Sequence, residues 1–375
     1  MTKKRRKSNN LRLIISLLVI ASIGFGVVKF VGFITSIFSD EGLTLKKTEA
    51  IEYTGRKNED NKVNIKSFNG YIIKFEEKKL SAYNEDGEQI WEKELDIEDV
   101  ILSGNKSYIA AVDSLKGKIY YLDYEGKIII EKSVDKKVMD VKLNDSGYVL
   151  IMLENEVFVF DEAGEIVSNF IIPKGEIIDG ELSMDNSTIA LTILVVEENK
   201  FYSNILFYSL DGKVLAGKKF DNEVTYKIFL TRDNNLVVLT NNSMMMMTTE
   251  DNILWEKDIG ETLNKGILTE NELLILNLIK KNNTIIDTKN RSVISQVDLN
   301  GNVLSNTPVA GEVLGLDVID DRIAVFTDRT IYVMDKKGNK IIEKKINKDI
   351  KNINWISKKK LLIIYRSKLE IMEIG

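Results

Sequence analysis

Short apolar runs rich in β-branched and aromatic residues alternate with turn residues along most of the chain, and no run after residue 38 shows the period of an amphipathic helix. Many runs are joined in pairs by Asp-Gly, Glu-Gly or Asn-Gly, dipeptides that tolerate the positive φ of a hairpin turn. Two further runs precede each pair, as in "VMDVKLN" followed by "YVLIMLE". The pattern predicts an all-β fold built from four-stranded units.

One phrase recurs seven times, for example as "DGEQIWEKEL" from Asp86 and as "DNILWEKDI" from Asp251. Its turn positions are Gly87, Gly126, Gly164, Gly212, Asn252, Gly301 and Gly338, at spacings of 37 to 49 residues. Four strands in a period of about 40 residues are typical of a β-propeller blade. A parallel β-helix would have shorter coils.

The number of blades depends on how the ring closes. Seven complete units run from Lys62 to Ile346, and the C-terminus adds three more strands, "IKNINWI", "KKLLIIY" and "KLEIMEI". An eighth blade without its fourth strand would expose an unpaired edge. The segment "LTLKKTEAIEY" (Leu43–Tyr53) is the natural donor of that strand. We therefore favour eight blades, with seven blades and an extra hairpin as the alternative.

The N-terminus predicts a membrane anchor. Residues 1–10 form a basic head, and the apolar run Leu13–Phe38 contains a single charge, Lys29. Such a run is long enough to span a bilayer, and basic residues before it favour a cytoplasmic N-terminus. We expect a cytoplasmic head at residues 1–10, a transmembrane helix at 11–38 and an extracytoplasmic propeller at 39–375. A cleaved signal peptide and a buried core helix are the alternatives.

The net charge of the predicted propeller limits the kinds of molecule that it can bind. Residues 1–38 hold seven of the 52 Lys and Arg residues and none of the 57 Asp and Glu residues, which leaves 45 against 57 and a net charge of −12 on the rest. An acidic body argues against nucleic acid as a partner. We expect another envelope or membrane protein, with the membrane itself contacted through the N-terminal helix.

The chain contains no cysteine and no histidine. This composition excludes disulfides, thiolate nucleophiles, Ser-His-Asp triads and the usual transition-metal sites. Acid–base chemistry by paired carboxylates stays possible. We expect no cofactor, no metal and no catalytic residue. The run Met244–Met247 is not expected to bind a metal either, because alternate side chains of a strand point to opposite faces; packing between blades is favoured.

The repeat phrase resembles that of the quinoprotein-dehydrogenase-like (BamB-like) β-propellers, whose blades carry a turn glycine followed by tryptophan. Here Gly87 precedes Trp91, and Trp255 holds the equivalent place four units later. The resemblance implies tryptophans that pack between blades, and the superfamily includes non-enzymatic eight-bladed members. Five of the seven units lack the tryptophan. The layout also resembles a membrane-anchored propeller family of unknown function from Gram-positive bacteria.

Two long repeat periods indicate insertions between the second and third strands of units four and six. They include "TILVVEENKFYSNILFY" and "LIKKNNTIIDTKNRSV". Loops on a rigid scaffold commonly carry binding residues. The candidate partner-binding residues are Phe201, Tyr202, Lys280, Lys281, Asn282 and Asn283. Insertions tolerated without a function are the alternative.

Three functions follow from these observations. The favoured one is a non-catalytic protein-binding scaffold of the cell envelope, held at the membrane by a single helix. The alternative is an ectodomain that binds or senses a small ligand, such as a glycan or a peptide. An enzyme, either a quinoprotein dehydrogenase or a carboxylate-based glycosidase, is the least favoured, since the adjacent cysteine pair of the quinoprotein enzymes is absent.

Overall fold

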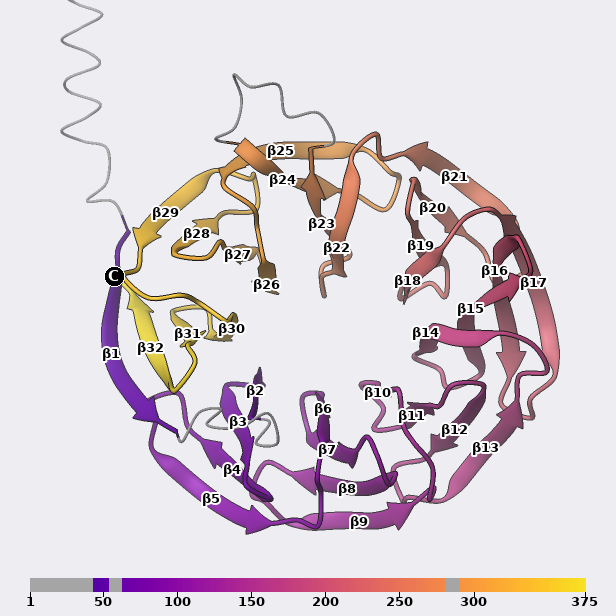
Figure 1. The fold of residues 1–375 in the computed structure, drawn as a ribbon, viewed down its shortest axis with the longest axis horizontal. Coiled ribbons are helices and arrows are strands. Elements are labelled where there is room, and N and C mark those ends of the chain that lie inside the picture. The colour runs from indigo at the N-terminus through magenta and orange to yellow at the C-terminus, as the bar shows by residue number, and fades with distance from the viewer. Residues whose placement is uncertain (1–42, 54–62, 281–289) are drawn as a thin grey trace, which may run out of the picture. The chain divides into compact units, whose positions relative to one another are not determined.

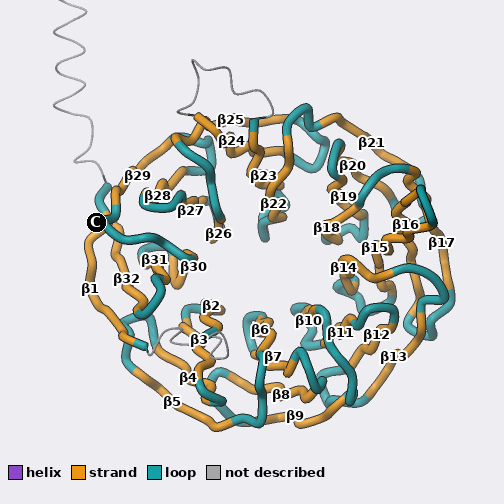
Figure 2. Tube along the Cα trace, in the orientation of Figure 1, coloured by secondary structure: helices purple, strands orange, loops and turns teal. Residues whose placement is uncertain are grey.

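In the computed structural model, the described residues are 43–53, 63–280 and 290–375. Within them the chain forms 32 strands in eight four-stranded sheets, which stand around a common axis as the blades of a propeller (Figure 1). Figure 2 shows these residues as strands and loops alone. The predicted all-β propeller is therefore confirmed. The predicted anchor at 11–38 lies outside the described residues, and none of those described belongs to a helix with the length and hydropathy of a membrane span.

The first four blades contain β2 (Asn64–Phe68), β3 (Tyr71–Glu76), β4 (Lys79–Tyr83) and β5 (Gln89–Glu94); β6 (Val100–Gly104), β7 (Tyr108–Asp113), β8 (Lys118–Asp123) and β9 (Ile128–Ser133); β10 (Asp140–Leu143), β11 (Val149–Met152), β12 (Glu156–Phe160) and β13 (Ile166–Ile171); and β14 (Glu176–Leu182), β15 (Thr188–Glu197), β16 (Lys200–Ser209) and β17 (Val214–Asp221).

The last four blades contain β18 (Thr225–Leu230), β19 (Leu236–Thr240), β20 (Ser243–Met247) and β21 (Ile253–Asp258); β22 (Thr262–Leu268), β23 (Leu274–Ile279), β24 (Asn290–Val297) and β25 (Val303–Ala310); β26 (Gly315–Ile319), β27 (Arg322–Phe326), β28 (Thr330–Met334) and β29 (Lys340–Lys345); and β30 (Asn352–Ser357), β31 (Lys360–Ile364), β32 (Lys368–Ile374) and β1 (Leu45–Glu52). In each blade the strands are given from the axis outward (Figure 1).

The eighth blade joins the two ends of the propeller. β1 pairs antiparallel with β32, and Leu45 lies opposite Ile374. The pairing continues past the strands, since Thr44 N donates to Gly375 O at 2.7 Å and Gly375 N donates to Thr44 O at 3.0 Å. The predicted closure of an eight-bladed ring by Leu43–Tyr53 is confirmed, and the seven-bladed alternative is wrong.

The recurring phrase forms the turn between the third and fourth strands. In blade two, Gly126 N donates to Asp123 O at 3.1 Å, and the Asp123 carboxylate accepts from Glu125 N at 3.0 Å and Lys127 N at 2.8 Å. A short polar side chain that accepts nearby amides holds such a turn without tertiary help. The same side-chain bonds recur at Asn84, Asp161, Thr248, Asp298 and Asp335.

Blade five corrects one position of the repeat. Asp251, with φ 69°, takes the place of the turn glycine, whereas the sequence analysis had assigned that place to Asn252. Each of the seven hairpins also has a register shift at the second residue of its outer strand. The residues at these bulges are Ile90, Ile129, Val167, Leu215, Leu254, Leu304 and Ile341.

The core lies between the blades rather than inside any one of them. Eight clusters of buried apolar side chains each draw on two neighbouring blades. The methionine run shows the arrangement, because Met244 and Met246 face blade six while Met245 and Met247 face blade four. Alternation along β20 thus serves two interfaces, as the packing interpretation of this run predicts.

The repeat tryptophans lie at such interfaces. Trp91 Nε1 donates to Tyr124 O of the next blade at 2.8 Å, and Trp255 Nε1 donates to Leu299 O at 2.7 Å. A Cβ on Gly126 would lie 2.7 Å from the Trp91 ring, so the glycine is required by space as well as by its φ of +83°. All six repeat glycines have positive φ: Gly87, Gly126, Gly164, Gly212, Gly301 and Gly338.

Replacing Leu45 with alanine should lower the free energy of unfolding by about 2–5 kcal/mol, because a buried leucine would leave a cavity beneath the closing strand. Leu45 is 1% exposed, while Leu43, two residues earlier, is 40% exposed and supplies the matched control. Leu43→Ala should change stability by no more than about 0.5 kcal/mol. Denaturant unfolding followed by tryptophan fluorescence measures both, and equal losses would contradict closure by β1.

Candidate functional site

The hairpin of β15 and β16 in blade four extends beyond its own sheet. Both strands have ten residues, the longest among those described. β14 pairs no further than Leu194, and β17 pairs no further than Tyr202. Val196 lies opposite Phe201 in the tip, and beyond the hairpin itself the backbone of Phe201 accepts one bond, from Asn222 N at 3.1 Å. The predicted insertion in blade four is a rigid two-stranded projection.

The two predicted aromatic residues lie on opposite faces of this hairpin. Tyr202 packs against the cluster between blades three and four, and Lys219 Nζ lies 4.2 Å from the centre of its ring. Phe201 is 38% exposed, and its cross-strand neighbour Val196 is 71% exposed. The exposed apolar surface of the tip is thus formed by Phe201 and Val196, a residue that the sequence analysis did not select.

Polar contacts hold the base of the hairpin. Ser203 Oγ donates to Glu223 O at 2.9 Å and accepts from Thr225 N at 2.9 Å, which ties β16 to the linker that leads into blade five. Nearer the turn, Lys174 forms an ion pair with Glu197, the last residue of β15. These bonds fix the direction in which the tip projects.

The second predicted insertion connects β23 and β24 in blade six, the position equivalent to the hairpin of blade four. Lys280 N donates to Arg291 O at 3.1 Å at its start. Lys281, Asn282 and Asn283 lie outside the described residues, so their relation to Phe201 stays a prediction. Blade five lies between the two insertions (Figure 1).

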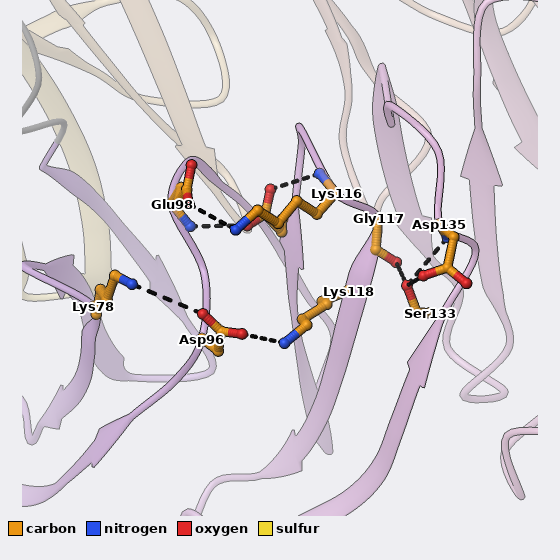
Figure 3. Close-up of polar contacts among 9 residues, drawn as sticks. Lys78, Asp96, Glu98, Lys116, Gly117, Lys118, Ser133 and Asp135 are labelled. Carbon is orange, nitrogen blue, oxygen red and sulfur yellow. Dashed lines mark hydrogen bonds and ion pairs between the residues drawn. The ribbon is translucent and has the colours of Figure 1, made fainter.

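Ion pairs connect the linker between blades one and two to the hairpin of β7 and β8 (Figure 3). Lys116 Nζ lies 2.6 Å from Glu98 Oε1, and Asp96 pairs with Lys118. The hydrogen bond from Lys118 lowers the pKa of Asp96. Lys78 lies 3.8 Å from the same carboxylate. All these side chains are about half exposed, and solvent screening makes such pairs weak. They order the linker rather than form a catalytic group.

The innermost strands bring a second set of residues together around the axis (Figure 1). These strands mix apolar and polar residues, and six of the eight contain lysine, aspartate or glutamate. The lysines are Lys66, Lys142, Lys227 and Lys265, and the carboxylates are Asp140, Asp179, Glu181 and Asp317. We call this set the axial cluster. The numbers of positive and negative groups are equal.

Half of the axial cluster is a network of ion pairs across blades three, four and five. Lys142 Nζ lies 2.8 Å from Glu181 and 3.2 Å from Asp179, and Lys227 Nζ lies 3.0 Å from Asp179. The Asp179 side chain is 4% exposed and also accepts Ile228 N at 3.0 Å. Burial opposes the charge of Lys142, but Glu181 and Asp179 outweigh it and raise the pKa of Lys142. All four groups of this half have an ion-pair partner, although burial still lowers the pKa of Lys227 and raises the pKa of Glu181.

The other half has no direct ion pair. Lys66 Nζ donates to Leu102 O at 2.6 Å, and Lys265 Nζ donates to Leu316 O at 3.1 Å, in each case to the next blade. Among the described residues, no carboxylate oxygen lies within 4.0 Å of either ammonium group. Burial lowers the pKa of both lysines.

Two cavities open at one mouth of the axis. One has a volume of about 610 Å³ and is lined in part by Asp317 and Trp355; the other has about 240 Å³ and reaches Glu181. Both include Lys106 and Glu270, whose charged groups lie 3.4 Å apart. These residues come from blades two and six, which are opposite in a ring of eight, so the ion pair crosses the mouth.

The sequence analysis did not identify the axial cluster. The available signal was a lysine in the otherwise apolar first strand of four units, as in "NIKSF" and "YKIFL". A lone charge in a strand is commonly a solvated residue, and only the ring geometry brings these lysines together. Within the described residues, no group of three acidic side chains is arranged to hold a metal ion.

Comparison with known proteins identifies the family and the fold. A family model described as "Family of unknown function (DUF5711)" matches residues 44–374. No curated protein matches the sequence. Among solved structures, BamB from Moraxella catarrhalis superimposes with a TM-score of 0.57 at 11% identity, covering 88% of this chain and 100% of that one.

Two other propellers are similar. Sqt1 from Saccharomyces cerevisiae has a TM-score of 0.63 at 11% identity, covering 88% of this chain and 100% of its own. The WD40 domain of SCAP from fission yeast has a TM-score of 0.59 at 10% identity, covering 90% and 99%. At these identities the likeness shows the fold alone, and it confirms the resemblance to BamB-like propellers.

Replacing Asp179 with asparagine should lower the free energy of unfolding by about 1–3 kcal/mol, because it leaves Lys142 and Lys227 with one carboxylate between them. The loss should fall below the 3–5 kcal/mol typical of fully buried pairs, since both lysines reach channel water. Asp211→Asn is the control, because Asp211 pairs with Lys213 at 3.1 Å on the exposed surface. Its effect should be within about 0.5 kcal/mol. Equal effects in urea unfolding would show that the network is not stabilising.

Proposed function

We propose, on the premise that the chain belongs to this family of unknown function, that the protein is a membrane-anchored extracytoplasmic propeller that binds another envelope or membrane protein. It acts as a scaffold and not as an enzyme. The propellers that it resembles in structure support the scaffold role at the level of the fold, while the partner and the location are our inference.

The exposed apolar tip of the blade-four hairpin is the observation that carries the proposal. Val196 and Phe201 form a cross-strand pair on one face, Ser203 holds the base of the hairpin, and Glu197 next to the turn pairs with Lys174. Binding to a preordered apolar anchor loses little conformational entropy. Aromatic residues in such positions commonly contribute much of the binding energy in protein interfaces. The tip therefore suits a protein partner.

A non-catalytic role agrees with the chemistry of the axis. Without cysteine or histidine, glycosidase-type acid–base catalysis would need a pair of carboxylates that are free to exchange protons. Asp179 and Glu181 are the two carboxylates of blade four that face the axis, and both are ion-paired with Lys142. Asp179 forms a second ion pair, with Lys227. Their arrangement supports a structural role.

The hairpin tip should be needed for capture of the partner. Val196→Ser with Phe201→Ser should reduce a crosslinked partner from native membranes at least tenfold, because the apolar contact is lost. Val214→Ser with Leu215→Ser is the matched control, since these residues are 58% and 56% exposed at the other end of the same blade. The control should retain the partner. Retention by both variants, or loss from both, would reject the tip as the binding surface.

Topology can be tested because the chain lacks cysteine. A single cysteine at Lys213, whose side chain is 79% exposed, should react with a membrane-impermeant maleimide on intact cells if the propeller is extracytoplasmic. A cysteine at Ser8 should react only after the cells are lysed. Mass spectrometry of the labelled protein measures both positions. Protection of Lys213→Cys in intact cells would refute the proposed location.

A further inference from the structure

The axial cluster contains two ammonium groups that the fold leaves incompletely bonded. An ammonium group has three hydrogen-bond donors, and the structure gives Lys66 and Lys265 one main-chain acceptor each. Both lysines belong to innermost strands, β2 and β22, which surround the axis (Figure 1). The remaining donors require water or a ligand.

The contrast within the cluster indicates which half is available. Lys142 and Lys227 have carboxylates within 3.2 Å, whereas Lys66 and Lys265 have none within 4.0 Å among the described residues. Partly desolvated positive charges are unfavourable unless an acceptor or an opposite charge lies beside them. An anion with oxygen atoms would supply both a hydrogen-bond acceptor and a negative charge.

The charges around the two lysines also favour an anion as the ligand. Burial lowers the pKa of Lys66, and the charge of Lys265 lowers it further, so the two lysines are close enough to repel each other. Asp140 acts on Lys66 in the opposite direction, as Asp317 does on Lys265. An anion between the two lysines would cancel their repulsion. The nearby carboxylates would disfavour a bulky, highly charged anion and so favour a small one.

We propose that the axial channel binds a small oxyanion, a carboxylate or a phosphate compound, between the ammonium groups of Lys66 and Lys265. This site is distinct from the hairpin tip and goes beyond the scaffold role. Lysine is well suited to such groups because it acts as a mobile point charge. The cavity of about 610 Å³ has the size of a small-molecule site and is lined by Ser67 and Asp317 but by neither lysine, so it adjoins the proposed site rather than contains it.

The ion pair between Lys106 and Glu270 crosses the mouth of the axis that the two cavities share. Their side chains are 65% and 71% exposed, and exposed pairs of this kind are weak. Parting this pair would join the two cavities that share it. The crossing therefore limits the size of what enters without sealing the channel.

The experiment measures binding of sodium phosphate and sodium acetate to the full chain in detergent by isothermal titration calorimetry. Ionic strength is held constant with sodium chloride, so that general screening does not contribute. We expect saturable binding of at least one anion to the unaltered chain. Lys66→Met with Lys265→Met should weaken it at least tenfold. Lys127→Met with Lys213→Met, which removes the same charge from exposed turns, should not.

A second measurement keeps the test valid if the double variant does not fold. Nuclear magnetic resonance of isotope-labelled lysine side chains, assigned with the two single variants, should show the pKa of Lys66 and Lys265 rising when the bound anion is added. Dioctanoyl phosphatidylglycerol serves as a third probe: binding by this lipid alone, lost in the variant, would assign the phosphate to a headgroup. No saturable binding by any probe, or equal binding by the double variant, would overturn the proposal.

Discussion

Burial of apolar side chains between neighbouring blades is the interaction on which the structure depends. No blade has a core of its own, because every cluster of buried residues draws on two sheets. A sheet in the ring is therefore covered only when both neighbours are in place. An open row of blades would leave two apolar faces in water, which is why pairing of β1 with β32 matters to all eight sheets.

The same geometry explains the polar axis. Side chains of the innermost strands converge where blades meet, so main-chain carbonyls of one blade come within reach of lysines of the one before it. Lys66 and Lys265 both use this contact. Their stems pack on protein while their charged ends reach channel water. Lysines that join neighbouring blades in this way also place charges along the channel. Ligand binding then requires only that some N–H groups of these lysines have no acceptor from the protein.

The sequence was sufficient for features that depend on local chemistry. The turns repeat because Asp123 and its equivalents bond to amides two and four residues away, and the missing fourth strand was evident from the edge that it would leave. Tyr202 shows what the sequence could not supply. Because Tyr202 follows Phe201 on a strand, the two side chains had to lie on opposite faces of the hairpin. Which of the two faces is buried depends on the packing of blade three. The axial cluster could not be predicted from the sequence, because residues of blades one and six come near each other only when the ring closes.

Closure by the two ends also fixes an order of events during synthesis. Leu45 pairs with Ile374, so the first strand of the propeller to be made has to wait for nearly the last residues of the chain. Contacts between such distant residues are the slowest to form, because they carry the largest loop-closure cost. Until then the last blade and the first both present open edges. Nascent chains of this protein should thus be most aggregation-prone in the period before β32 pairs with β1, when a chaperone would have most effect.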